Sequence, residues 1–317
     1  MGKESVTFLE VGEAAAGQRI DNFLFKHLKG VPKSHVYRIL RSGEVRVNQG
    51  RVGPERRLAV GDRVRIPPVR LAERPDEPAP PPRDFPVVFE DEAILVVDKP
   101  AGVAVHGGSG VSFGIIEQLR AARPEARFLE LAHRLDRETS GLLIIAKKRA
   151  ALVRLQDQFR LGQIDKHYLA LVKGRWRDAL RNVRLPLLKF LTPEGERRVR
   201  VAAHGKAAHS IVRLQGHWAT PWGSASLLEV ALRTGRTHQI RVHLAHLGHP
   251  ILGDEKYGDF GLNRDLQKRG LRRMFLHAAS LTLPHPLTGE KIELVSSLPQ
   301  ELAEFLEQLT GTADVAL

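Results

Sequence analysis

The stretch HRLDRETSGLLIIAK, residues 133–147, decides how the rest of this chain is interpreted. It places Asp136 between Arg134 and Arg137, just before an apolar run, 142–146, that predicts a buried strand. Charges anchored to a buried strand are costly unless they pair or meet a ligand. Nearby cations favour the ionised form of a carboxylate, so Asp136 is expected to be an anion suited to nucleophilic attack. From spacing alone, a structural ion pair is the simpler interpretation.

The composition indicates a globular protein with a polyanionic partner. The chain has 317 residues, of which 42% are hydrophobic and 27% charged, enough for about two domains. Its formal net charge is +13, which favours nucleic acid first and an anionic membrane surface second. The absence of cysteine excludes disulfides, thiolate metal sites and cysteine catalysis. Neither a membrane-spanning run nor a signal peptide is evident, so a cytoplasmic protein is expected.

Most of the positive charge lies near the N-terminus. Residues 17–70 hold thirteen Lys or Arg against four acids. Apolar residues from Ile20 to Leu28 recur at helical spacing, and a second helix is expected with Ser34 as its N-cap and Gly43 at its end. Short strands are expected at 45–48 and 62–66. Two basic helices and a small sheet predict a compact RNA-docking module.

The segments RIDNFLFKHL, VPKSHVYRILRSGEVRVNQGRV and VGDRVRIP resemble the S4 RNA-binding domain. The resemblance makes 17–70 an S4-like domain that follows an N-terminal extension, 1–16. It implies contacts to structured RNA from four residues of the second helix: Lys33, Ser34, Arg38 and Arg41. Residues 71–86 carry six prolines and are expected to form a semi-rigid linker to a large domain, 87–317.

The large domain predicts an α+β fold. Strand pieces are expected within 87–98 and at 166–172. Helices are expected at 113–123, ending before Pro124, at 150–161, and at 299–309. Short strands with few helices do not form a regular βαβ succession, which favours α+β.

Several blocks of this domain resemble the pseudouridine synthases, specifically the branch that modifies large-subunit ribosomal RNA. They are HRLDRETSGLLIIAK, DKPAGVAVHGG, the K-x-Y-x-A pattern at 166–170, GRTHQIR and GHPILGDEKYG. The resemblance implies a mixed, mostly antiparallel sheet and Asp136 as the catalytic nucleophile. It implies that Tyr168 packs against the target base and that a basic residue pairs with Asp136. Arg236 is our first choice for that residue and Arg241 the second.

The same resemblance implies the reaction and the partner. The reaction would isomerise uridines of 23S ribosomal RNA to pseudouridine after the base has left its stack. No cofactor is implied, and a monomer without an obligate protein partner is expected. Further substrate contacts are expected from Arg134, His133, Arg241 and His106, and the basic segment 174–206 is expected to frame the RNA cleft.

Three alternatives are weighed against this interpretation. Four histidines, His238, His243, His246 and His249, lie close together, but they lack the spacing of a zinc helix, so no metal is expected. A non-catalytic assembly factor would have lost the Asp, Tyr or Arg constellation. A glycosidic hydrolase would need a second placed acid, for which Glu138 and Asp98 are weak candidates.

Overall fold

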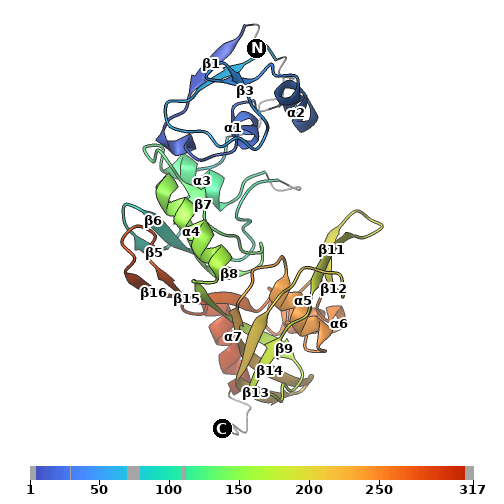
Figure 1. Cartoon of the computed structure of the whole chain (residues 1–317). Helices are drawn as coiled ribbons and strands as arrows, with labels where there is room; N and C mark the ends of the chain where they lie inside the picture. Colours follow the sequence, from blue (N-terminus) through green and yellow to red (C-terminus); the bar gives the residue numbers. More distant parts are fainter. Residues whose placement is uncertain (1–4, 29, 70–78, 109–111, 311–317) are drawn as a thin grey trace. The chain divides into compact units, whose positions relative to one another are not determined.

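The computed structural model describes residues 5–28, 30–69, 79–108 and 112–310, and the chain falls into two compact units, 1–80 and 81–317 (Figure 1). Residues 71–78, half of the predicted linker 71–86, lie outside the described residues. The predicted N-terminal extension contributes a strand, β1 (Thr7–Glu10), that pairs with β4 (Arg63–Ile66). The N-terminal unit therefore begins before residue 17.

The N-terminal unit packs two helices against a small antiparallel sheet. The helices are α1 (Ile20–His27) and α2 (Lys33–Arg41). The sheet has the order β1-β4-β2-β3, with β2 (Arg46–Val47) and β3 (Gly50–Arg51) forming a hairpin. Buried apolar side chains from both helices and from β4 form one core. The two helices, β2 and β4 agree with the elements expected from the sequence, whereas β1 and β3 were not predicted.

The N-cap of α2 corrects one prediction. Pro32, not Ser34, occupies this position, and its carbonyl accepts the backbone N–H groups of His35 and Val36 at 2.9 and 3.2 Å. The chain turns helical directly after Pro32, so Ser34 lies inside the first turn. Its side chain is exposed, as are those of Lys33, Arg38 and Arg41.

The second unit is built on a large mixed sheet with the strand order β10-β13-β14-β9-β15-β8-β6-β5; β16 pairs with β15 and β7 with β8. The pairing of β8 with β15 is parallel and the others are antiparallel. The α+β class and the mostly antiparallel sheet are confirmed. The strands are β5 (Val87–Glu90), β6 (Ile94–Lys99), β7 (Glu130–Leu131), β8 (Ser140–Ala146), β9 (Asp165–Lys173), β10 (Leu180–Val183), β13 (Ser210–Thr220), β14 (Gly223–Leu232), β15 (Leu276–Pro284) and β16 (Lys291–Val295).

Strand β8 is an interior strand of the large sheet and is buried on both faces. Successive side chains of a strand point to opposite faces. Leu143 and Ile145 therefore join one core, whereas Leu142 and Ile144 join another. Helix α4 (Arg149–Leu161) packs into the second core. Residues of α3 (Ile115–Ala122), α5 (Gln239–His246), α6 (Phe260–Lys268) and α7 (Gln300–Thr310) belong to the first.

A separate hairpin, β11 (Leu187–Leu191) and β12 (Arg197–Val201), stands apart from the large sheet (Figure 1). Val199 of β12 and Val242 of α5 share a small apolar cluster at its base. The hairpin is therefore attached to the helix that follows the GRTH segment.

Candidate active site

Asp136 lies on the loop between β7 and β8, and backbone hydrogen bonds hold that loop. The Asp136 carbonyl accepts the Thr139 N–H at 3.1 Å. The next carbonyl, of Arg137, accepts the Gly102 N–H at 2.9 Å and the Lys99 ammonium at 2.9 Å. Hydrogen bonds from the DKPAG segment thus support the loop that carries Asp136.

Gly141 explains why the motif ends in Ser-Gly. Its φ is +107°, and a Cβ at this position would lie 2.2 Å from the carbonyl oxygen of Ala278 on β15. Only glycine allows this backbone conformation together with such close approach. Gly141 therefore lets β8 and β15 pair in parallel directly after the loop that carries Asp136.

Lys99 is a fully buried cation beneath this loop. Its Nζ donates to the carbonyl oxygens of Pro100, Val103 and Arg137 at 2.7–2.9 Å. Burial lowers the pKa of Lys99 to about 7, with Glu138 and Asp136 opposing the shift and Arg273 adding to it. A lysine with three carbonyl acceptors ties the DKPAG turn to the Asp136 loop.

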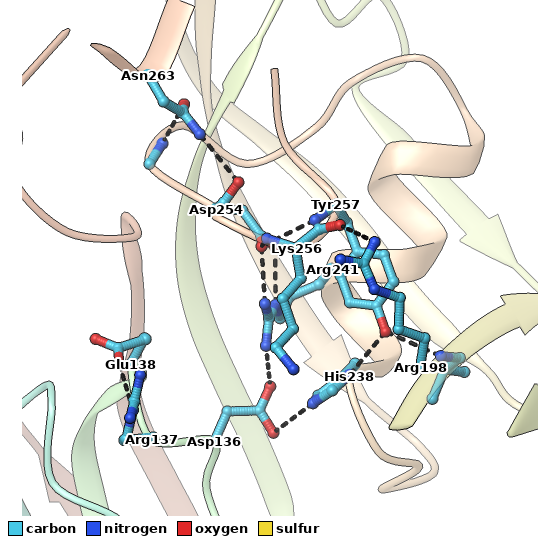
Figure 2. Close-up of polar contacts among 12 residues, drawn as sticks. Asp136, Arg137, Glu138, Arg198, His238, Arg241, Asp254, Lys256, Tyr257 and Asn263 are labelled. Atoms are coloured by element: carbon cyan, nitrogen blue, oxygen red, sulfur yellow. Dashed lines mark hydrogen bonds and ion pairs between the residues drawn. The ribbon is translucent and has the colours of Figure 1, made fainter. Parts of the chain in front are cut away.

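Arg241 is the ion-pair partner of Asp136 (Figure 2). Its Nη1 donates to Asp136 Oδ2 at 3.0 Å. Its Nε and Nη2 donate to the two oxygens of Asp254 at 2.8 and 2.7 Å, a bidentate pair that fixes the guanidinium plane. Asp254 also accepts the backbone N–H groups of Lys256 and Tyr257 at 2.8 and 3.1 Å. One buried arginine thus joins two carboxylates.

The two carboxylates, Asp136 and Asp254, differ in their exposure to solvent and in how many of their oxygens are hydrogen-bonded. The side chain of Asp254 is 1% exposed and both its oxygens are engaged, whereas that of Asp136 is 24% exposed. Burial alone would raise the pKa of Asp254, but the Arg241 guanidinium outweighs it and holds the pKa below the usual range. Burial likewise opposes the charge of Arg241, yet Asp254 and Asp136 raise its pKa. Asp254 holds Arg241, and Arg241 holds Asp136.

The prediction that Arg236 pairs with Asp136 is wrong, because Arg241, the second choice, is the partner. Arg236 is exposed, and its Nε donates to the carbonyl of Ala207 at 3.1 Å. It lies before the first turn of α5, whereas Arg241 lies within the helix and is 5% exposed. Arg137 pairs with Glu138 at 2.7 Å and Arg134 is exposed, so neither flanking arginine is the hydrogen-bond partner of Asp136.

A cavity of about 400 Å³ opens beside Asp136. Tyr168 lines it, is 8% exposed, and has its pKa raised by burial and then by the charge of Asp136. The phenol therefore keeps its proton at neutral pH. The sequence-predicted residues His133, Arg134, Arg236 and Arg241 also line the cavity.

His238 lies beside Oδ1 of Asp136, the oxygen that does not accept from Arg241. Its backbone φ is +54°, an uncommon conformation for a residue with a side chain. The Tyr257 hydroxyl accepts the Val199 N–H at 2.9 Å and lies 2.8 Å from His238 Nδ1. His238 Nε2 lies 3.9 Å from Asp136 Oδ1, and a carboxylate there favours the tautomer with its proton on Nε2, in which Nδ1 accepts from the Tyr257 hydroxyl. Burial lowers the pKa of His238, with Asp136 opposing, which favours this neutral form.

Sequence reasoning missed Asp254, His238 and Tyr257 as parts of the site. Each lies within a block that was quoted for its resemblance, but no spacing rule links residues so far apart in the chain. A carboxylate in the GDEKYG segment was the only signal for a partner of Arg241.

His133 and His106 occupy different surroundings. His133 Nε2 accepts the Ile144 N–H at 3.0 Å, and burial, followed by the nearby charge of Lys166, lowers its pKa to about 3. It is therefore a neutral residue that ties the loop to β8. His106 is exposed, with its Nδ1 2.8 Å from the Gly107 carbonyl, and does not line the cavity.

A family model described as RNA pseudouridylate synthase matches residues 93–246, and the S4 domain model matches residues 18–64. The chain is 50% identical over 316 residues to ribosomal large subunit pseudouridine synthase C of Yersinia pestis, covering 98% of each chain. It is 51% identical over 314 residues to the protein of that name from Escherichia coli K12, covering 96% of this chain and 97% of the relative. This chain belongs to the pseudouridine synthase family.

Solved structures agree with this family. The human protein RNA pseudouridylate synthase domain containing 4 is 27% identical, with a TM-score of 0.58, and covers 73% of this synthase and 94% of that chain. Human RNA pseudouridylate synthase domain containing 1 is 26% identical, with a TM-score of 0.56, and the match covers 73% of this synthase and 96% of that chain. The synthase is thus an RNA-modifying enzyme with an S4 domain at its N-terminus.

Two negative findings apply to the described residues alone. Within them, no helix is long and apolar enough to cross a membrane. Over the same ranges, no three metal-ligating side chains come together: His238 and His243 bond to Tyr257 and Ser210, and His249 to a backbone carbonyl.

Proposed function

We propose that this synthase isomerises uridines of large-subunit ribosomal RNA to pseudouridine, with Asp136 as the reacting carboxylate. The observation that carries the proposal is the placement of Asp136 between Arg241 and the cavity. One of its oxygens is held by Arg241, and the residue lines a cavity together with Tyr168. The names of the relatives and the basic N-terminal unit support the choice of RNA.

The reaction breaks the N1–C1′ glycosidic bond, turns the uracil, and joins C5 to C1′. The target nucleotide must first leave its stack, which costs a few kcal/mol. Asp136 then either attacks C1′ or removes a ribose proton to give a glycal. Either role uses the negative charge of the Asp136 carboxylate, and the buried guanidinium of Arg241 holds that carboxylate in position.

Tyr168 is proposed to hold the uracil while it turns. An aromatic face against a base contributes about 1–3 kcal/mol of stacking. Because its pKa is raised, Tyr168 presents a phenol, which can donate a hydrogen bond to a uracil carbonyl but is a poor base for the C5 proton. Recognition of RNA phosphates by Lys33, Ser34, Arg38 and Arg41 stays a prediction, as do the roles of His106 and Arg134 and a monomeric state.

A glycosidic hydrolase is the weaker candidate. Such an enzyme needs a second carboxylic acid that can protonate the leaving group. Asp254 shares Arg241 with Asp136, but Arg241 lowers the pKa of Asp254, and both oxygens of Asp254 accept hydrogen bonds. It cannot serve as that acid at neutral pH.

The test is pseudouridine mapping of transcribed 23S ribosomal RNA treated with the full-length protein. Wild type should convert discrete uridines, and Asp136→Asn should convert none while binding the RNA with nearly unchanged affinity. Glu138→Gln, a change in the neighbouring carboxylate, is the matched control and should keep most activity. Full turnover by Asp136→Asn would remove Asp136 from the chemistry.

A further inference from the structure

The active-site cavity extends along β9 beyond Tyr168 to a lysine that the reaction does not use. Lys166 and Tyr168 are two residues apart in this strand, so their side chains project from the same face about 7 Å apart. Both line the cavity that contains Asp136. A ligand that reaches Asp136 and Tyr168 can therefore also reach Lys166.

Lys166 is a buried cation with few partners. It is 7% exposed, and its Nζ makes one long hydrogen bond, 3.4 Å, to the carbonyl of Ile164. The ammonium also lies 5.4 Å from the centre of the Phe159 ring. An ammonium has three donors, and within the described part of the chain no carboxylate pairs with this one. Burial lowers its pKa, because an unpaired charge in an apolar wall is unfavourable.

The surroundings of Lys166 indicate the charge of its missing partner. Arg134, Arg160, Arg233 and Arg236 line the same cavity. Arg160 and Arg233 already have carboxylates of their own, Asp157 at 2.9 Å and Asp165 at 2.7 Å. Lys166 therefore lies in a positive region, where an anion is favoured over a neutral carbonyl group. His133, its other close neighbour, is neutral and cannot supply that anion.

We propose that Lys166 binds the phosphate of the RNA backbone next to the target uridine, and so holds the flipped nucleotide while Asp136 acts at its ribose. The inference rests on the proposed RNA reaction and extends it to one residue of the substrate site. Phosphodiester oxygens would accept from the free donors of Nζ and supply the negative charge that is missing beside Lys166. The cation would thus be unsatisfied in the free protein and satisfied in the complex.

The first experiment compares Lys166→Met with Lys166→Arg in the full-length protein, using a 23S ribosomal RNA fragment that wild type modifies. Removing one phosphate-binding cation should weaken binding about 10-fold or more at 0.1 M salt and make the slope of log K against log[salt] shallower by about 0.7. Lys166→Arg should keep the slope. Lys173→Met is the matched control at the other end of β9, where Lys173 pairs with Asp259, and should leave the slope unchanged.

A second measurement separates this role from a structural one. A methylphosphonate beside the target uridine removes the phosphate charge; it should weaken binding to wild type and have no further effect on Lys166→Met. The melting temperature of Lys166→Met should equal or exceed that of wild type, because an unpaired buried cation is removed. A lower melting temperature with an unchanged salt slope would overturn the proposal. Failure of wild type to convert any uridine would instead overturn the proposed function.

Discussion

Arginine has opposite roles in the N-terminal unit and in the cavity beside Asp136. On α2, Arg38 and Arg41 are exposed, and Arg38 meets Glu44 only at 3.6 Å. In the cavity, Arg241 is 5% exposed and makes three hydrogen bonds to two carboxylates. Exposed cations attract a polyanion over a wide surface and each contributes little. A buried, fully bonded arginine fixes one carboxylate in one position.

This contrast predicts that single changes in the cavity have larger effects than single changes on α2. It also predicts that the two regions fail differently. Removal of cations from α2 should change affinity and salt dependence. Removal of Arg241 should change turnover and folding stability.

The largest effect is expected for Arg241→Met. Breaking a buried ion pair leaves uncompensated charges on Asp136 and Asp254, which should cost about 3–5 kcal/mol of unfolding free energy. Turnover should fall at least ~100-fold, as expected when a preorganised charge partner is removed. Denaturant unfolding and single-turnover kinetics measure the two quantities. Arg236→Met is the matched control in the same segment, and an equal fall in turnover in both variants would restore Arg236 as a catalytic residue.

The N-terminal counterpart is the triple change Lys33→Ala, Arg38→Ala and Arg41→Ala. We expect affinity for 23S ribosomal RNA to fall about 10- to 100-fold at 0.1 M salt, with a slope shallower by about 0.7–0.9 for each phosphate that is no longer neutralised. Turnover at saturating RNA should stay near that of wild type, because the cavity is unchanged. Lys291→Ala, an exposed lysine on β16, is the control. Unchanged RNA affinity of the triple variant would show that these α2 residues do not contribute to RNA binding.

The sequence predicts the elements of both regions better than it predicts their side-chain partners. Helix and strand positions follow from periodicity and stop signals that lie within a few residues. The partner of Asp136 depends on where α5 begins and which way its first turn faces, so the sequence placed Arg236 above Arg241, the wrong order. Asp254 becomes decisive only when it lies against Arg241, and that depends on tertiary packing. The N-cap of α2 shows the same limit, since Pro32 and Ser34 both fit a helix start.

Lys99 gives an effect on stability that depends on pH. Its folded-state pKa of about 7 lies below its ordinary value, so between about pH 7 and 10.5 the unfolded chain binds more protons than the folded one. Its contribution to stability should therefore rise with pH through this window, by up to about 1.4 kcal/mol per pH unit. Unfolding free energies of wild type and Lys99→Met, measured from pH 6.5 to 9.5, should diverge accordingly. Parallel curves would show that the three carbonyl groups keep Lys99 protonated throughout.

The smallest effect is expected at Tyr257, which links the β11–β12 hairpin to His238 beside Asp136. Tyr257→Phe removes the hydroxyl that accepts from Val199 and donates to His238 Nδ1. Each such hydrogen bond contributes about 1 kcal/mol, so the single-turnover rate should fall about 3- to 10-fold at neutral pH. Without the hydroxyl donor, His238 is protonated more easily, and a charged His238 competes with Arg241 for Asp136. The acid limb of the rate profile should therefore move to higher pH.

Tyr37→Phe is the control for this change, because Tyr37 lies in the N-terminal unit and its hydroxyl donates to Asp21 at 3.4 Å. It should leave the rate profile unaltered between pH 5 and 8. If Tyr257→Phe lowers the rate by the same factor at every pH, the hydroxyl only supports the loop. A shifted acid limb confined to Tyr257→Phe would instead show that a neutral His238, held by the hairpin, leaves Asp136 paired with Arg241 alone.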